Sequence, residues 1–218
     1  MSQKYKRDSF GDRMKTYERL AESQLIPNLP IVVRLDGKSF SKYTSRLERP
    51  YDLKLIELMQ NTCKHLMKIS HNIKVAYQQS DEITLIISND YDKPVEYNGR
   101  VQKLCSILAA ECSVYFATHA YPVFDCRIFN VPTWVEASNA VLWREQDASK
   151  NSIQSVGHYY FSQNELYKLN CDQIQQKLLL EKDINWNDYP TAFKRGSYIK
   201  REKYFDPNLN TERSHFVV

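Results

Sequence analysis

The chain has 218 residues, with 30 Lys or Arg against 26 Asp or Glu and a formal net charge of +4. Hydrophobic residues make up 42% and charged residues 26%, a globular mixture that excludes a disordered, collagen-like or low-complexity chain. No apolar run approaches the roughly 20 residues that span a bilayer, and the polar start is unlike a secretory signal. We therefore expect no membrane association. The small positive charge permits a nucleic-acid partner without predicting one.

The five cysteines indicate in which cellular compartment the protein is located. Their number is odd and no Cys-x-x-Cys spacing occurs, so we expect buried free thiols in the reducing cytoplasm. The five histidines are scattered along the chain, which disfavours a zinc site. The cysteines are Cys63, Cys105, Cys112, Cys126 and Cys171.

The first third of the chain predicts two helices around a strand. Residues 1–29 are polar with a helical pattern that ends at two prolines. The β-branched run 31–35 predicts a buried strand, which stops at an Asp-Gly turn dipeptide. Apolar residues then recur with helical spacing over residues 53–69, and Asp52 is expected to cap this helix.

The middle third predicts a hairpin, a helix and a strand. Residues 73–79 and 83–88 alternate as strands and are separated by only three residues, which indicates a hairpin. A helix is expected to follow, capped by Asn98, and residues 124–131 read as a fourth strand. The order is therefore βαββαβ over residues 31–131, the ferredoxin-like arrangement. Right-handed crossovers place both helices on one face of an antiparallel sheet.

The last third differs in character. Residues 135–157 and 172–180 are expected to be helical, and Ser162 begins a sequence that matches a capping box. Residues 192–218 are basic and are expected to form a loop. The predicted fold class is thus α+β: a ferredoxin-like sheet with added helices at both ends.

Acidic residues are expected to meet at one edge of this sheet. The first and third strands are central and antiparallel, so Asp36 at the end of one lies beside Asp81 and Glu82 at the start of the other. Like charges at that distance need a cation, and oxygen ligands suit Mg²⁺, which also takes substrate phosphates. Two such ions would suit phosphoryl or nucleotidyl transfer. Ordinary turn chemistry remains the alternative reading of these residues.

The run that follows Asp36 has features of a phosphate-binding turn. Gly37 permits a tight turn whose backbone N–H groups face an anion, and Lys38 supplies charge. The run lacks the spacing of the Walker A motif, so by itself it does not define a phosphate site.

Five motifs in order resemble the tRNA-His guanylyltransferase superfamily, over about Tyr17 to Lys200. They are Ile31 to Phe40, Ala76 to Glu82, Phe124 to Arg127, Trp143 to Asp147 and Phe193 to Gly196. The resemblance implies a palm-like catalytic domain over residues 1–135, including the N-terminal helical segment. Residues 136–218 would be helical and basic additions packed on the same unit.

The resemblance also implies an activity. Members of this superfamily add nucleotides to the 5′ end of tRNA in the 3′–5′ direction. ATP activates a 5′-monophosphate by adenylylation, and the 3′-hydroxyl of an incoming nucleotide, GTP or another nucleoside triphosphate, attacks the activated end. Two Mg²⁺ ions are the implied cofactors, tRNA is the implied partner, and a homo-oligomer, commonly a tetramer, is the implied assembly.

Site residues follow from the same resemblance. Asp36, Asp81 and the Gly37 carbonyl would hold the metal, with Glu82 as a catalytic helper. The triphosphate would lie on the turn Gly37, Lys38, Ser39, Phe40 and Ser41 and on the Ser80 hydroxyl. The implied tRNA or phosphate contacts are Arg34, Arg100, Lys103, Arg127, Lys150, Asn151, Lys194 and Arg195.

Two departures indicate the guanylyltransferase-like branch. The stretch Ser149 to Gln154 replaces a His-Ile-Asn-Asn-Leu-Tyr pattern, and Ser41 stands where the guanylyltransferases often have His. This branch tends toward template-dependent repair of shortened tRNA 5′ ends. Two rivals share parts of the pattern: a nucleotide cyclase with a palm, and a non-catalytic RRM-like module with the same βαββαβ order. The aromatic sheet motif that is typical of RRM modules does not occur in this sequence.

Overall fold

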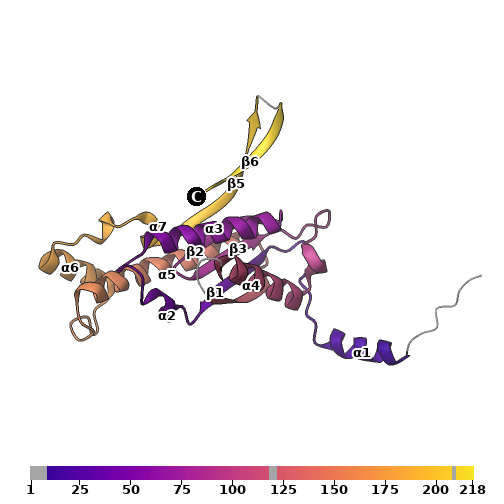
Figure 1. The fold of residues 1–218 in the computed structure, drawn as a ribbon, viewed down its shortest axis with the longest axis horizontal. Helices are drawn as coiled ribbons and strands as arrows, with labels where there is room; N and C mark the ends of the chain where they lie inside the picture. Colours follow the sequence, from indigo (N-terminus) through magenta and orange to yellow (C-terminus); the bar gives the residue numbers. More distant parts are fainter. Residues whose placement is uncertain (1–8, 118–121, 208–209) are drawn as a thin grey trace, which may run out of the picture.

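The computed structural model describes residues 9–117, 122–207 and 210–218, which form one six-stranded antiparallel sheet with helices on both faces (Figure 1). The strand order is β4-β1-β3-β2-β5-β6. The strands are β1 (Ile31–Lys38), β2 (Ile73–Gln79), β3 (Glu82–Ile87), β4 (Val123–Asn130), β5 (Ser197–Asp206) and β6 (Thr211–Val217). The α-helices are α1 (Ser9–Leu20), α2 (Phe40–Thr44), α3 (Leu53–Ile69), α4 (Val101–Ala117), α5 (Trp134–Tyr160), α6 (Cys171–Lys182) and α7 (Thr191–Arg195).

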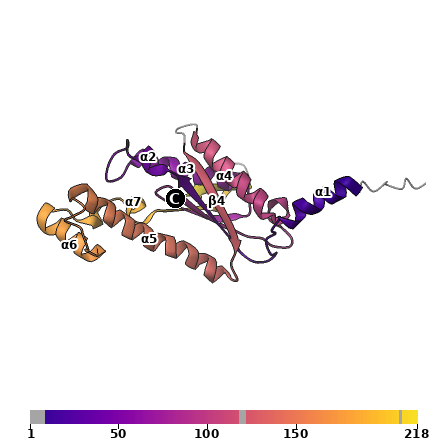
Figure 2. The same cartoon turned by 90° about the horizontal axis from the view of Figure 1, so that it is seen from below.

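The predicted βαββαβ order is confirmed. Strand β1 pairs antiparallel with both β3 and β4, so the first and third strands are central neighbours. Figure 2 shows α2, α3 and α4 on one side of the sheet and the long helix α5 on the other. The added helices and the extra strands surround this central unit.

Strand alternation explains the two covered faces. On β1, Val33 and Leu35 join the main core beneath α3 and α4. The intervening Val32 packs with Ala137 and Val141 of α5 in a smaller cluster. Because successive side chains point to opposite faces, Arg34 and Asp36 share the α5 face with Val32.

Helix capping follows the sequence at two places. The Leu55 amide donates to Asp52 Oδ1 at 3.0 Å, which confirms Asp52 as the cap of α3. The Thr133 hydroxyl accepts from the Glu136 amide at 3.2 Å and begins α5, which extends to Tyr160. Both caps satisfy amides that have no partner inside the helix.

The prediction of a loop over residues 192–218 is wrong. Strands β5 and β6 form a hairpin there, and β5 adds to the sheet by pairing Ser197 with Gln78 and Lys200 with Val75. The segment alternates as a strand does, because Ser197 and Ile199 are buried and Tyr198 and Lys200 are not. The many basic residues made this alternation hard to recognise in the sequence. Beyond Lys200 the hairpin is mostly exposed and stands away from the body (Figure 1).

Three local expectations also need correction. Among the described residues of 1–29, the α-helix spans only Ser9–Leu20, and residues 1–8 lie outside the description. Asn98 does not cap α4, because it lies in the 3₁₀ segment Glu96–Gly99 with a left-handed φ of 56°. Ser162 does bond to Glu165, but turns follow instead of a helix. The capping box is at Asn170, where α6 begins.

The C-terminal helices have a core of their own. Val156 of α5 packs with Ile174 and Leu178 of α6 and with Trp186 of the 3₁₀ segment Trp186–Asp188. All five cysteines are free. Cys63 and Cys112 are buried as expected, whereas Cys105, Cys126 and Cys171 are only half-buried. Across the described ranges, no helix combines the length and apolar character that crossing a bilayer requires.

Candidate functional site

The predicted acidic edge is present. Asp36 on β1 lies opposite Glu82 on β3 and opposite Asp125 on β4. The Gly37 amide donates to the Asp81 carbonyl at 3.1 Å, which ties the end of β1 to the β2–β3 turn. The end of β1 and the start of β3 therefore lie side by side, as the predicted antiparallel pairing of these strands required.

Electrostatics at this edge favour a cation. Burial raises the pKa of Asp81 above its ordinary value, and the nearby Asp36 charge raises it further. Hydrogen bonds from the Asp81 backbone and the Ser80 side chain act in the opposite direction. The described residues contain no cluster of three or more His, Cys, Asp or Glu suited to hold a metal by themselves. Two carboxylates and a carbonyl fit Mg²⁺ only when phosphates or water complete the shell.

Glu82 is held by arginine. Its Oε1 accepts from Arg144 Nε at 2.6 Å, and its Oε2 lies 4.0 Å from Arg34 Nε. Arg144 also donates to Asp147 at 2.8 Å. Burial raises the pKa of Glu82, while the Arg144 guanidinium acts against that rise. The Trp143 to Asp147 motif on α5 therefore supplies a positive partner for the acidic edge.

The turn after β1 is shaped by Gly37 and Ser39. A Cβ on Gly37 would lie 2.2 Å from the Phe40 ring, so this close approach requires glycine. Ser39 has a left-handed φ of 56° and leads into α2. Phe40 itself is core, packed against Phe116 and Phe124, so only its backbone is available to a ligand. Lys38 and Ser41 are exposed.

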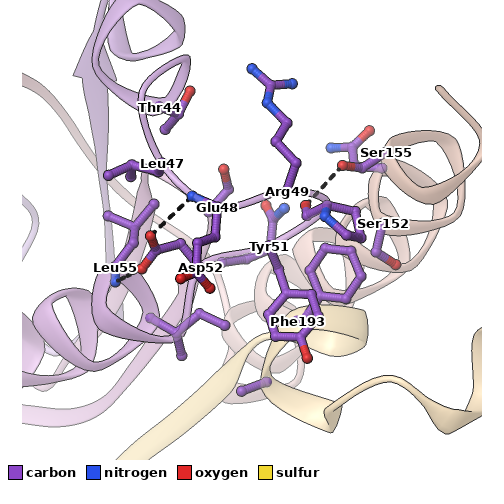
Figure 3. Close-up of a pocket in the computed structure, with 16 residues that line it drawn as sticks. Thr44, Leu47, Glu48, Arg49, Tyr51, Asp52, Leu55, Ser152, Ser155 and Phe193 are labelled. Carbon is purple, nitrogen blue, oxygen red and sulfur yellow. Dashed lines mark hydrogen bonds between the residues drawn. The ribbon is translucent and has the colours of Figure 1, made fainter. Parts of the chain in front are cut away.

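A cavity of about 200 Å³ opens beside the β2–β3 turn (Figure 3). Its wall includes Ser80, Asn151 on α5 and the loop between α2 and α3. Tyr51 and Phe193 stack at 5.0 Å on one side, and Asp52 accepts from the Glu48 amide at 3.2 Å. We name this the loop cavity. Tyr51 and Glu48 were not predicted as site residues, because only folding brings their loop beside the β2–β3 turn and the Phe193 motif.

Several predicted RNA contacts lie near the acidic edge. Arg34 and Arg127 are paired across β1 and β4 on the α5 face. Asn151 lines the loop cavity, and Lys150 beside it is exposed. Arg195 lies 3.6 Å from Glu145, and Lys194 stands over the Trp186 ring. These last two cations thus have partners within the chain.

Arg100 and Lys103 are not brought to the acidic edge. Arg100 immediately precedes α4 and Lys103 lies in its first turn. The end of α4 instead lies near Phe124, whose amide donates to Ser113 at 2.9 Å, and Phe124 is opposite Gly37. A 17-residue helix places its ends about 25 Å apart. Arg100 instead lies 3.4 Å from Glu22.

Comparison with known proteins identifies a family. A family model described as tRNAHis guanylyltransferase matches residues 11–132, more than half of the chain. An uncharacterized protein of Acanthamoeba polyphaga mimivirus is 31% identical, over 89% of this chain and 78% of its own length. The tRNA(His) guanylyltransferase of Debaryomyces hansenii is 27% identical, over 87% of this chain and 79% of its own length.

Solved structures agree. A bacterial tRNA(His) guanylyltransferase (Thg1)-like protein in complex with ATP is 37% identical, with a TM-score of 0.85 over 88% of each chain. The complex described with GTP is 35% identical, with a TM-score of 0.83 over 96% of this chain and 90% of that one. These findings confirm the predicted palm-like α+β fold and the enzymatic reading. The chain belongs to the tRNA(His) guanylyltransferase family, nucleotidyltransferases that add nucleotides to the 5′ end of tRNA in the 3′–5′ direction.

Proposed function

We propose that this enzyme repairs shortened tRNA 5′ ends by template-dependent 3′–5′ addition. The alternative reaction is the addition of guanylate to tRNA-His. The supporting observation is that the edge formed by Asp36 and Asp81 adjoins a cavity beside Ser80. Similar proteins with this fold have been solved in complex with ATP and with GTP. Ser149 to Gln154 on α5, in place of the guanylyltransferase pattern, favours the repair reaction.

The acidic edge fits two Mg²⁺ ions. Asp36, Asp81 and the Gly37 carbonyl would hold them, because Mg²⁺ binds one or two carboxylates and takes its other ligands from water and substrate phosphates. Burial raises the pKa of Asp81, and the nearby Asp36 charge adds to that rise, so a bound cation would offset the cost of keeping both carboxylates ionised. When bound, Mg²⁺ supplies positive charge to the transferring phosphoryl group.

The residues of the chain position the nucleotide. We place the triphosphate on the backbone amides from Gly37 to Ser41, with Lys38 as a charge partner and the Ser80 hydroxyl as a donor. The loop cavity then receives the base between its aromatic wall and Asn151. Arg144 fixes the Glu82 carboxyl group opposite Asp36, where Glu82 would act as the catalytic helper.

The remaining predicted contacts suit a long polyanion. Arg34 and Arg127 would meet the phosphates of the tRNA end, and Lys150, Lys194 and Arg195 would continue that path. Arg100 and Lys103 would contact RNA away from the reacting end. Such phosphate contacts make affinity fall with salt. We also propose a cytoplasmic homotetramer, which accords with the free cysteines and with the exposed Phe10, Tyr17 and Leu20 of α1.

The test is incorporation of label. The protein is incubated with Mg²⁺, ATP, GTP labelled in its α-phosphate and a 5′-monophosphorylated tRNA that lacks its first nucleotide. We expect the label at the RNA 5′ end. The amount incorporated should depend on which template base lies opposite the missing nucleotide. A cyclic nucleotide formed without RNA would instead indicate a cyclase, and RNA binding without turnover would indicate a non-catalytic module.

The state of the 5′ phosphate should matter. Because the Ser149 to Gln154 stretch departs from the pattern of efficient activators, a 5′-triphosphorylated tRNA should react faster than a 5′-monophosphorylated one. The measurement is single-turnover addition to the two RNAs, with and without ATP. Equal rates on both RNAs would show that adenylylation is not weakened in this chain.

A further inference from the structure

The loop between α2 and α3, residues 45–52, forms one wall of the loop cavity without any helix or strand of its own. The amides of residues 45–47 donate to carbonyls of α2, and the Glu48 amide donates to Asp52 at 3.2 Å. These bonds shape the loop internally. The position of the loop over the cavity therefore depends on its contacts with other parts of the chain.

Tyr51 attaches this loop to the C-terminal helices. Its ring stacks on Phe193 of α7 with 5.0 Å between the ring centroids and 26° between the planes (Figure 3). The Tyr189 ring meets the same Tyr51 ring edge-on, at 5.9 Å and 85°. Tyr189 and Phe193 are themselves 5.6 Å apart, so they form a notch that holds one ring. Both pack against the core of the C-terminal helices, which gives Tyr51 a firm support.

Two hydrogen bonds attach the cavity walls to the same part of the molecule. The Ser155 hydroxyl on α5 donates to the Pro50 carbonyl at 3.2 Å, next to Tyr51 in the loop. Trp186 of the C-terminal core donates through Nε1 to the hydroxyl of Ser152 at 3.1 Å, and Ser152 lines the cavity on α5. The loop wall and the α5 wall are thus held by one body, which fixes the width of the cavity.

The ring contacts are strong enough to decide whether the loop stays over the cavity. A pair of aromatic rings in these geometries changes a local equilibrium up to about tenfold beyond the effect of its buried area. Loops held by few contacts open more readily than helices or strands. Without the notch, a ligand in the cavity would bind only the fraction of molecules in which the loop is closed. Its apparent affinity would fall by that fraction.

We propose that the C-terminal helices hold the nucleotide-binding wall of the loop cavity in place through Tyr51, with Tyr189 as a positioning residue behind it. Tyr189 is not among the described residues that line the cavity, so it acts on a bound base only through Tyr51 and Phe193. This inference rests on the proposed function for the identity of the ligand, a nucleoside triphosphate whose base occupies the cavity.

Four variants separate this positioning from a general loss of stability. Tyr51→Ala removes the attached ring, Tyr189→Ala removes one side of the notch, and Tyr189→Phe retains the ring there. The matched control is Tyr115→Ala, because Tyr115 is a half-buried tyrosine of α4 whose ring stacks on His65 at 4.4 Å. His65 lies about 15 Å along α3 from Leu55, which lines the cavity. Thermal unfolding checks that each variant folds.

Hydrogen exchange of the free protein tests the attachment without a ligand. The peptide that covers residues 45–52 should exchange about tenfold faster in Tyr51→Ala and Tyr189→Ala than in the parent protein. It should exchange at the parental rate in Tyr189→Phe and Tyr115→Ala.

Nucleotide binding tests the consequence for the cavity. Affinities for ATP and for GTP are measured with Ca²⁺ in place of Mg²⁺, so that no turnover is needed. Tyr189→Ala should weaken nucleotide binding about tenfold, and Tyr189→Phe should restore most of the affinity. In nucleotide addition, the KM for the nucleotide should rise by the same factor in Tyr189→Ala, while kcat stays near the parental value.

The proposal is overturned if the loop exchanges at the parental rate in Tyr189→Ala, or if this variant binds both nucleotides as tightly as Tyr115→Ala. Failure of the repair reaction is a separate result. A protein that loses nucleotide affinity in Tyr189→Ala but never adds GTP to the shortened tRNA would contradict the proposed function and leave the role of Tyr189 standing. If the parent protein bound neither nucleotide, the proposed function would fail, and the exchange rates would still decide whether Tyr51 holds the loop.

Discussion

Asp36→Asn and Asp81→Asn should each lower nucleotide addition roughly a thousandfold or more, while the protein stays folded. The physical reason is that the amide keeps the shape of the side chain but removes the charge that we propose binds Mg²⁺ at the end of β1. The measurement is single-turnover incorporation of GTP into the shortened tRNA. A second measurement is the rise in melting temperature on adding Mg²⁺ with nucleotide, because a ligand that binds only the folded state stabilises it. This rise should be lost in both variants.

The matched control is Asp90→Asn. Asp90 lies just past the other end of β3, is exposed, and is separated from the acidic edge by the length of that strand. It should retain addition close to that of the parent protein. Undiminished addition by Asp36→Asn or Asp81→Asn, with Asp90→Asn equally active, would contradict the metal assignment.

Gly196→Ala should cost about 3 kcal/mol or more of unfolding free energy. Gly196 has φ 78° and ψ −169°, a region that is essentially restricted to glycine. An added Cβ would lie 2.4 Å from the Gln78 carbonyl and 2.6 Å from the Tyr77 hydroxyl, so backbone strain and overpacking add together. The same Tyr77 hydroxyl donates to the Arg195 carbonyl at 2.8 Å. Urea denaturation followed by circular dichroism measures the loss.

Gly157→Ala is the control for this glycine. Its added Cβ would lie 2.8 Å from Ile174 Cγ2 and 3.2 Å from Leu166 Cδ1, and side-chain methyl groups shift at a lower cost than a backbone carbonyl. Alanine also favours the helix by up to about 1 kcal/mol relative to glycine. Its loss should therefore be clearly smaller. If both variants lose equal stability, the close approach of Gly196 to β2 is not what anchors β5.

The order of elements was predictable because it rests on local patterns. The β-branched run from Ile31, the helical spacing after Asp52 and the short turn before Glu82 each contain their own signal. The C-terminal hairpin was missed because its signal is not local. Only Ser197 and Ile199 are fully buried in β5, and the exposed remainder reads as a basic loop. Pairing with β2, more than a hundred residues earlier, decides that this segment is a strand.

The candidate site divides in the same way. The sequence by itself determined the acidic edge, since antiparallel pairing of two predicted strands required Asp36 to meet Asp81. It also determined the family, through motifs that retain their order. Only the tertiary structure decided which cations are already paired, as Arg144 is with Glu82, and which lie remote, as Arg100 does. It alone formed the loop cavity, because the walls come from a loop, α5 and α7 together, and packing between distant segments leaves no periodic trace in a sequence.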